Sequence, residues 1–413
     1  MDLSKLPPPV DRRYLFVDMN SFFASCEQLA DPRLQDRPIA VIAAPNSCIL
    51  AASYPAKAFG LKTGMPTAEA RALCPKLILK LSRPRYYMQI HYQIMRLLND
   101  LTPRVTVKSI DEAVIRICRN EEPSQLAQAI KARLYQEFGP AIRCSIGIAA
   151  NPFLAKLASN LQKPNGLTEI QLLEMPRLCR QLHLTDLNGI SRPMFRQFQA
   201  IGINRPLDLW QAEPEYLRQR LGLVGWRLWL NLHGYPIQWS QRHLVSASHS
   251  HVLPPAYRSL AGAELTLARL VQKLGLRLRR AKRTTQRQTL MVRALGRYSH
   301  VSWLRSAPLA DDLGLRQNFT WLWQNWQASL TAFERSQVKV IQLAVIAQDL
   351  IPLQATSRSL WPEQERRWRL SQALDLINDR FGVDTIRTGQ NWHQGSSAPD
   401  RISLNALSPI EFE

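Results

Sequence analysis

Short runs of apolar and β-branched residues that contain or adjoin acidic side chains constrain the fold of this chain most strongly. Residues 14–19 read YLFVDM, residues 104–117 read RVTVKSIDEAVIRI and residues 143–149 read RCSIGIA. Their composition and alternation predict β-strands, the second run forming either one long strand or a strand pair. Asp18 would end the first strand and Asp111-Glu112 would lie within the second. An ionised carboxylate in such a place is costly unless its charge is compensated.

A divalent cation commonly provides this compensation where three carboxylates converge. Hard oxygen ligands favour Mg²⁺, which proteins usually share with substrate phosphates. Two such ions can activate an attacking hydroxyl and neutralise a leaving pyrophosphate. The alternative is structural, with Asp18 as a solvated strand end and Asp111-Glu112 as an ordinary acidic pair. The residues by themselves leave both interpretations open.

The charge of the chain indicates a polyanionic partner. Its 413 residues include 53 Lys and Arg against 32 Asp and Glu, a net charge of +21. Such a field attracts nucleic acid first and an anionic membrane surface second. No apolar run approaches the roughly 18 residues of a membrane crossing, and the N-terminus does not read as a signal peptide. The six cysteines show no CxxC or Cys/His cluster, which predicts reduced thiols in a cytoplasmic protein.

The other segments alternate between helical and strand patterns. Helices are predicted at 21–29, 69–74, 88–101 and 151–161, a strand at 38–43 and a helix stop at 163–166. Residues 170–240 predict short helices, and residues 246–256 predict a polar link without a regular element. Further helices are expected at 264–282, 315–330 and 369–380, and strands at 289–294 and 338–347. We expect Trp321, Trp323 and Trp326 to be core residues, not base-stacking ones.

Four blocks together resemble the Y-family translesion DNA polymerases of the ImpB/MucB/SamB type. They are FVDMNSFFASCEQ (16–28), SYPAKAFGLKTGMP (53–66), SIDEA (109–113) and SIGIAANPFLAKLASNLQKPNG (145–166), in the family's order and spacing. The resemblance implies an α+β right hand with a ferredoxin-like palm, small fingers, a helical thumb and a separate α/β little finger. The implied boundaries are palm 10–28 and 88–169, fingers 29–87, thumb 170–240, linker 241–256, DNA-binding little finger 257–355 and C-terminal tail 356–413.

The resemblance implies template-directed DNA synthesis past lesions, in DNA repair and the SOS response, without proofreading. Two Mg²⁺ ions would promote attack of the primer 3′-OH on the α-phosphate of a dNTP. A catalytically weak or inactive DNA-binding accessory subunit is the alternative, because residues 251–255 (HVLPP) resemble a tract of a mutagenesis-accessory branch. A nucleotide cyclase would use a similar palm, but it would have no use for the basic C-terminal region.

Site residues are implied position by position. The metal ligands would be the side chains of Asp18, Asp111 and Glu112 and the carbonyl of Met19. Phe23 would be the steric gate that excludes a 2′-hydroxyl, and Phe22 would support it. The triphosphate would be held by Tyr54, Lys57 and Lys163.

Four positions depart from the family pattern. Lys57 replaces a common arginine and Ala51 replaces a threonine, which removes two sources of hydrogen bonds to the triphosphate. Arg116 follows the acidic pair where the family often has Asp, and alternation places it on the strand face of Glu112. Asn20 replaces a second Asp of some members, a mild change.

DNA contacts are implied in two regions. Residues 187–203 resemble a degraded helix-hairpin-helix, in which Gly189 would approach a phosphate although Ser191 replaces the second glycine. Residues 273–293 contain eight basic side chains and no acidic one. The expected DNA-binding residues there are Lys273, Arg277, Arg279, Arg280, Lys282, Arg283 and Arg287. A plain helical hairpin and a solvated helix face are the respective alternatives.

Protein partners are implied more weakly than DNA. Residues 357–361 (SRSLW) and 372–376 (QALDL) each match part of the family's sliding-clamp peptide. The first segment lacks the glutamine, and the second lies inside a predicted helix. A sliding clamp and other proteins of a mutagenesis complex are therefore expected partners, whereas a membrane is not.

Overall fold

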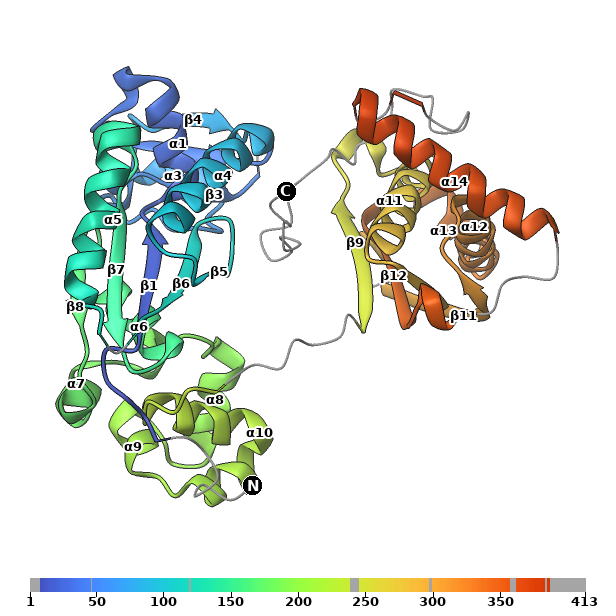
Figure 1. Cartoon of the computed structure of the whole chain (residues 1–413). Helices are drawn as coiled ribbons and strands as arrows, with labels where there is room; N and C mark the ends of the chain where they lie inside the picture. The colour runs from blue at the N-terminus through green and yellow to red at the C-terminus, as the bar shows by residue number, and fades with distance from the viewer. Residues whose placement is uncertain are drawn as a thin grey trace. The chain divides into compact units, whose positions relative to one another are not determined.

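The computed structural model describes residues 8–45, 47–118, 120–237, 245–296, 299–356, 362–382 and 385–386. The chain divides into two compact units between residues 238 and 239. Each unit combines helices with β-sheet (Figure 1), which confirms the predicted α+β fold class. All six cysteines carry free thiols in the structure. None of the helices that the structure describes is long and apolar enough to span a bilayer.

A five-stranded sheet forms the centre of the first unit. Its strands are β1 (Tyr14–Met19), β5 (Val105–Val107), β6 (Glu112–Arg116), β7 (Cys144–Ala149) and β8 (Leu167–Glu169), in the order β5-β6-β1-β7-β8. β1 lies in the middle and runs antiparallel to both β6 and β7. Residues 104–117, expected to form either one long strand or a strand pair, form the antiparallel pair of β5 and β6. The three runs singled out in the sequence are therefore neighbours.

Helices cover both faces of this sheet. Leu15 and Val17 of β1 pack in one core cluster with α1 (Phe22–Ala30), α4 (Pro84–Leu101) and α5 (Pro123–Phe138). Phe16 belongs to a second cluster on the opposite face, with α6 (Pro152–Leu161) and the helices that follow it. Because side chains alternate along a strand, Asp18 lies on the α6 face together with Phe16.

Two smaller parts complete the first unit. A three-stranded sheet, β3-β2-β4, contains the predicted strand β2 (Ile39–Ile42) and two unpredicted strands, β3 (Ile49–Ala52) and β4 (Ile78–Leu81). Its associated helices are α2 (Tyr54–Lys57) and α3 (Thr67–Leu73). The short helices predicted after residue 170 are α7 (Met175–Gln181), α8 (Arg192–Ala200), α9 (Pro206–Gln211) and α10 (Pro214–Leu232).

The second unit is built on a four-stranded antiparallel sheet. The order is β11-β10-β12-β9, with β9 (Ser246–Val252), β10 (Arg283–Ala294), β11 (Ser299–Leu309) and β12 (Val340–Pro352). The helices are α11 (Leu260–Arg280), α12 (Asp312–Ala328), α13 (Ala332–Gln337) and α14 (Pro362–Phe381). Trp323 and Trp326 are buried in the core, as predicted, whereas Trp321 is exposed.

The prediction for the start of the second unit is wrong. Residues 246–252 were expected to lack regular structure, but they form the edge strand β9, which pairs with β12 from Val252 to Ser246. The linker expected at 241–256 therefore does not extend over these residues. The run SASHSHV lacks large apolar side chains, yet Ala247 and His251 are buried while the serines alternate outward. The pairing partner lies some ninety residues away in the sequence and decides the conformation.

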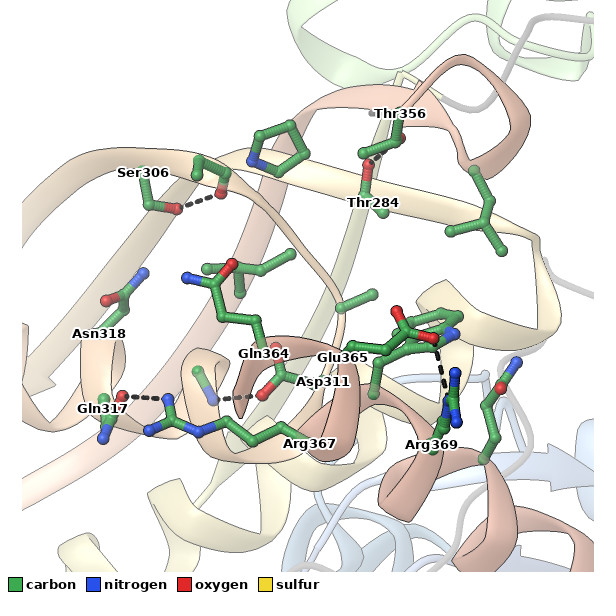
Figure 2. Close-up of a pocket in the computed structure, with 18 of the residues that line it drawn as sticks. Thr284, Ser306, Asp311, Gln317, Asn318, Thr356, Gln364, Glu365, Arg367 and Arg369 are labelled. Atoms are coloured by element: carbon green, nitrogen blue, oxygen red, sulfur yellow. Dashed lines mark hydrogen bonds and ion pairs between the residues drawn. The ribbon is translucent and has the colours of Figure 1, made fainter. Parts of the chain in front are cut away.

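The second unit also contains a pocket of about 1150 Å³ between α12, α14 and the end of β11. Figure 2 shows the ion pair between Glu365 and Arg369, 3.0 Å, and the hydrogen bond from Arg367 to Gln317, 3.4 Å. The wall of this pocket carries two acidic and two basic side chains, together with many uncharged amide and hydroxyl groups. Gln372, the first residue of the candidate clamp segment 372–376, lines this pocket, whereas none of the predicted metal, nucleotide or DNA ligands does.

Candidate active site

The strand register brings the three predicted acidic residues to one end of the large sheet. Asp18 of β1 stands directly opposite Glu112 of β6. Asp111 immediately precedes β6, and its carbonyl accepts a hydrogen bond from the backbone N–H of Met19, 2.9 Å. The Ser109 hydroxyl donates to Asp111 Oδ1, 2.6 Å. Residues almost one hundred positions apart in the sequence thus share one small region.

Burial makes this region electrostatically costly. Loss of hydration raises the pKa of Asp18, and the charges of Glu112 and Asp111 raise it further, against the opposing effect of Lys163. Burial also raises the pKa of Asp111, with the charge of Glu112 adding to the shift. Crowded carboxylates of this kind gain stability from a nearby positive charge.

Lysine side chains supply part of that positive charge. Lys163 Nζ lies 2.7 Å from Asp18 Oδ1, and Lys156 Nζ lies 2.7 Å from Glu112 Oε1. Metal sites usually need three or more acidic, histidine or cysteine side chains in a suitable arrangement. The described part of the chain contains no such arrangement while the carboxylates pair with lysines. The donor set still fits a hard divalent cation, because it consists of carboxylate oxygens, and burial raises the pKa of two of these carboxyls, Asp18 and Asp111.

A network of amide and hydroxyl groups anchors the loop that carries Lys163. The buried Asn20 side chain accepts a hydrogen bond from the Asn165 backbone N–H, 2.7 Å, and donates to Ser145 Oγ, 3.0 Å. The Gly166 N–H also donates to Ser145 Oγ, 3.3 Å. Asn20, noted above as a mild departure, therefore fixes the loop that brings Lys163 to Asp18.

A third lysine, Lys57, lies near the carboxylates. Lys57 Nζ donates to Ser21 Oγ, 2.8 Å, and lies 4.5 Å from the centre of the Tyr54 ring. Partial loss of hydration lowers the pKa of Lys57, and the nearby charge of Lys163 lowers it further. Burial and the charge of Asp18 raise the pKa of Tyr54 to about 12, so its hydroxyl keeps its proton at neutral pH. Two mutually repelling ammonium groups and a hydroxyl donor suit a polyphosphate.

The predicted gate residue rests on a rigid support. The Phe23 ring stacks on Tyr87 with centroids 4.7 Å apart and planes at 16°. Tyr87 is 1% exposed and donates to Glu27, 2.7 Å, and Arg83 binds the same carboxylate through two nitrogens, 2.9 and 2.8 Å. Phe22 is buried in the adjoining core. Sequence reasoning missed Tyr87, because its position under Phe23 depends on the packing of α4 against α1.

Arg116 lies away from the acidic cluster. It stands opposite Tyr14 at the other end of β6 from Glu112, and its side chain is exposed. Although Arg116 shares the strand face of Glu112, it is therefore not beside the acidic cluster. Ala51 lies in β3, opposite Val41. Lys156 is the charged group that sequence reasoning overlooked, although it lies within the block 145–166 that carries the family resemblance.

Residues 187–203, which resemble a helix-hairpin-helix, keep the first glycine of the expected turn but not the second. Gly189 has a φ of +88°, a conformation that glycine adopts without strain. Ser191 caps α8 instead of continuing a glycine turn, and its hydroxyl accepts from the Met194 N–H, 3.4 Å. A phosphate contact at Gly189 remains a prediction.

The basic residues of 273–293 do not form one stripe. α11 packs against the sheet and ends at Arg280, and Lys282, with a φ of +50°, turns the chain into β10. Arg287 lies on the face of β10 turned away from the helices, with its guanidinium 4.4 Å from the Trp303 ring centre. Arg277 donates to the Ser248 carbonyl, 3.1 Å.

The prediction that Arg279 contacts DNA is wrong. Its side chain is 5% exposed and binds Asp312, 2.8 Å, and Asp375, 2.6 Å. Helix α14 covers this side chain. The sequence of α11 alone does not predict its burial, because α14 is distant in the chain. Arg280 pairs with Asp379 at the surface.

The structure describes only one of the two candidate clamp-binding segments. Residues 372–376 lie inside α14, where Asp375 is committed to Arg279. Residues 357–361 lie outside the described residues.

Comparison with known proteins identifies relatives over most of the chain. Residues 17–160 match the model of the impB/mucB/samB family, and residues 245–360 match the impB/mucB/samB family C-terminal domain. A DNA polymerase IV of Pelotomaculum thermopropionicum is 32% identical over 90% of this chain and 93% of the relative. A DNA polymerase IV of Moorella thermoacetica is 31% identical over 91% and 95%.

The solved structures give the same indication for the fold. A Y-family DNA polymerase chimera superposes with a TM-score of 0.68 at 22% identity, covering 82% of this chain and 99% of the chimera.

Proposed function

This chain belongs to the impB/mucB/samB family and is a Y-family DNA polymerase, and we propose that it extends primers past lesions by two-Mg²⁺ nucleotidyl transfer without proofreading. The observation that carries the proposal is the opposition of Asp18 and Glu112 beside Asp111, with Lys163 and Lys57 adjoining. Acidic oxygens and ammonium groups are the two kinds of group that a metal-bound triphosphate requires.

In this proposal Asp18, Asp111, Glu112 and the Met19 carbonyl hold the divalent cations. The cations, when bound, supply Lewis acidity at the primer hydroxyl and the phosphates. The chain itself supplies the oxygens at fixed positions, because β1 and β6 are held in register by the sheet. The raised pKa values of Asp18 and Asp111 reflect the cost of keeping these charges together before a cation arrives.

The triphosphate would bind to Lys57, Lys163 and Tyr54. Binding would exchange the Lys163–Asp18 ion pair, 2.7 Å, for a lysine–phosphate contact and free Asp18 for a cation. The Phe23 ring, supported by Tyr87, would lie under the sugar and exclude ribonucleotides. Because Lys57 and Ala51 replace groups that offer more hydrogen bonds, we expect weaker nucleotide affinity than an arginine and a threonine would give.

Primer-template DNA would be gripped by both units. In the first unit the turn at Gly189 would contact a phosphate, and in the second unit the candidates are Lys273, Arg277, Arg280, Lys282, Arg283 and Arg287. Arg279 is withdrawn from this set because it is buried. We also propose that the protein acts in the SOS response and is located in the cytoplasm. Residues 357–361 are the proposed clamp-binding segment.

The competing function is a catalytically weak accessory subunit that only binds DNA. It rests on the resemblance of residues 251–255 to a tract of a mutagenesis-accessory branch and on the departures at Ala51, Lys57 and Arg116, of which Arg116 is exposed at the other end of β6 from Glu112. All three carboxylates are also present at the sheet end.

A single-nucleotide insertion assay with Mg²⁺ separates the two functions. We expect the natural chain to extend a primer and Asp111→Ala to bind the same DNA without extending it. Equal DNA binding with no extension by either protein would establish the accessory role. Persistence of a mismatched primer end, followed over the same time course, tests the absence of proofreading.

A further inference from the structure

Lys156 forms the second ion pair of the acidic cluster, and the proposed function gives it no task. Its ammonium nitrogen lies 2.7 Å from Glu112 Oε1 and 5.3 Å from the centre of the Phe16 ring. The side chain of Lys156 is 31% exposed and that of Glu112 is 18% exposed. The pair is thus sheltered, and its geometry is more restricted than that of a surface salt bridge.

The fold holds Lys156 in this place through the packing of α6. Asn151 caps the helix by accepting from the Leu154 N–H, 2.8 Å. Gly147 of β7 allows the helix backbone to approach closely, because a Cβ there would lie 1.9 Å from the Ala155 carbonyl oxygen. Since Asp18, Glu112 and Phe16 all lie on the α6 face of the sheet, a lysine on this helix reaches the cluster directly.

The three carboxylates have different partners. Asp18 pairs with Lys163, which is expected to move to the triphosphate, and Asp111 accepts from the Ser109 hydroxyl. Glu112 pairs with Lys156, which comes from a packed helix and not from a loop. A partner on a rigid element can keep its contact while the substrate binds and leaves.

We propose that Lys156 is a positioning residue, which fixes the Glu112 carboxylate by holding Oε1 and leaves the other oxygen to a divalent cation; this rests on the proposed polymerase function. Groups that orient a metal ligand typically change activity or metal affinity by about 10- to 100-fold when removed. Lys156 also places a positive charge against a ligand oxygen, which disfavours binding of a cation on its own.

A Lys156→Met variant would lose both effects, the orientation of Glu112 and the repulsion of the cation, and the two losses have opposite consequences. The methionine keeps an unbranched side chain over Phe16 but removes the ammonium group. A cation should then bind the protein more tightly, because one positive charge has left the site. Nucleotide insertion should nevertheless become slower, because Glu112 can rotate freely.

The test uses the full chain and a readout besides activity. Mn²⁺ binding without DNA or nucleotide is followed by electron paramagnetic resonance, and nucleotide insertion is followed under single-turnover conditions. For Lys156→Met we expect tighter Mn²⁺ binding, an insertion rate lower by about tenfold or more and a nucleotide dissociation constant within about twofold. Lys156→Arg should recover most of the rate, and the exposed Lys76→Met serves as the matched control.

Two results would overturn the inference. One is an unchanged insertion rate in Lys156→Met. The other is weaker or unchanged Mn²⁺ binding together with a lower melting temperature, which would indicate a packing role alone. Failure of the proposed function looks different, because Asp111→Ala would then extend primers as the natural chain does, or neither would extend them.

Discussion

Replacing Arg279 with alanine should destabilise the second unit without weakening its electrostatic attraction to DNA. The guanidinium donates to both Asp312 and Asp375 and also to the Ala310 carbonyl, 2.8 Å. Its side chain is 5% exposed, while the two carboxylates are 17% and 20% exposed. The alanine variant would leave these two acids close together without a cation between them.

The size of the effect follows from this burial. Removing one partner of a buried ion pair costs about 3–5 kcal/mol, and we take about 3 kcal/mol because both carboxylates keep some contact with water. For a unit of this size that corresponds to a melting temperature lower by about 6–12 °C. Arg280→Ala is the control for stability alone, because Arg280 and Asp379 are 60% and 54% exposed and such pairs contribute at most about 1 kcal/mol.

Thermal unfolding and DNA binding at several salt concentrations together decide the role of Arg279. Amide hydrogen exchange in α14 should accelerate in Arg279→Ala, because Asp375 of this helix loses its contact with Arg279. Loss of one phosphate contact would reduce the salt slope of DNA binding by about 0.9, and we expect no such change. Wild-type stability combined with a reduced slope would refute the structural role and restore the DNA contact read from the sequence.

Three further variants test other parts of the molecule. Asp111→Asn should abolish insertion yet raise the melting temperature at neutral pH without divalent cations. Because burial raises the pKa of Asp111 and Asp18, the cation-free natural chain should also gain stability as the pH falls through these raised pKa values toward the ordinary value of 3.8. Calorimetry with EDTA would show a loss instead if the carboxylates were solvated. Phe23→Ala should lower the preference for deoxyribonucleotides by about 10- to 100-fold, and unchanged sugar discrimination in competition assays would remove the gate assignment. Gly147→Ala should cost about 2 kcal/mol or more in urea unfolding, because its Cβ would lie 1.9 Å from the Ala155 oxygen; a neutral result would contradict the close packing of α6.

The parts of the site that lie within short sequence segments could be predicted from the sequence. The strands at Asp18 and Asp111-Glu112 are real and adjacent, because short runs rich in apolar and β-branched residues favour the buried, pleated surface of a sheet. The predicted triphosphate residues Lys57 and Lys163 also lie by the acidic cluster. These features depend on short segments and on a family resemblance carried by the same segments.

Long-range pairing explains what the sequence analysis missed. β9 is polar and exists because β12 provides its hydrogen-bond partners. The burial of Arg279 depends on Asp375, which comes from a helix 96 residues later in the chain. Tyr87 and Lys156 were overlooked because each acts through a contact with another element, Phe23 for the first and Glu112 for the second.

The direct location of bound cations tests the central claim that Asp18, Asp111 and Glu112 form a divalent-cation site. Anomalous diffraction from Mn²⁺ in crystals of the chain with primer-template DNA and a non-hydrolysable nucleotide would measure this. We predict two peaks within bonding distance of these carboxylates, with Lys163 turned from Asp18 to the triphosphate. Peaks elsewhere, or ordered DNA and nucleotide with no cation at the sheet end, would contradict the account.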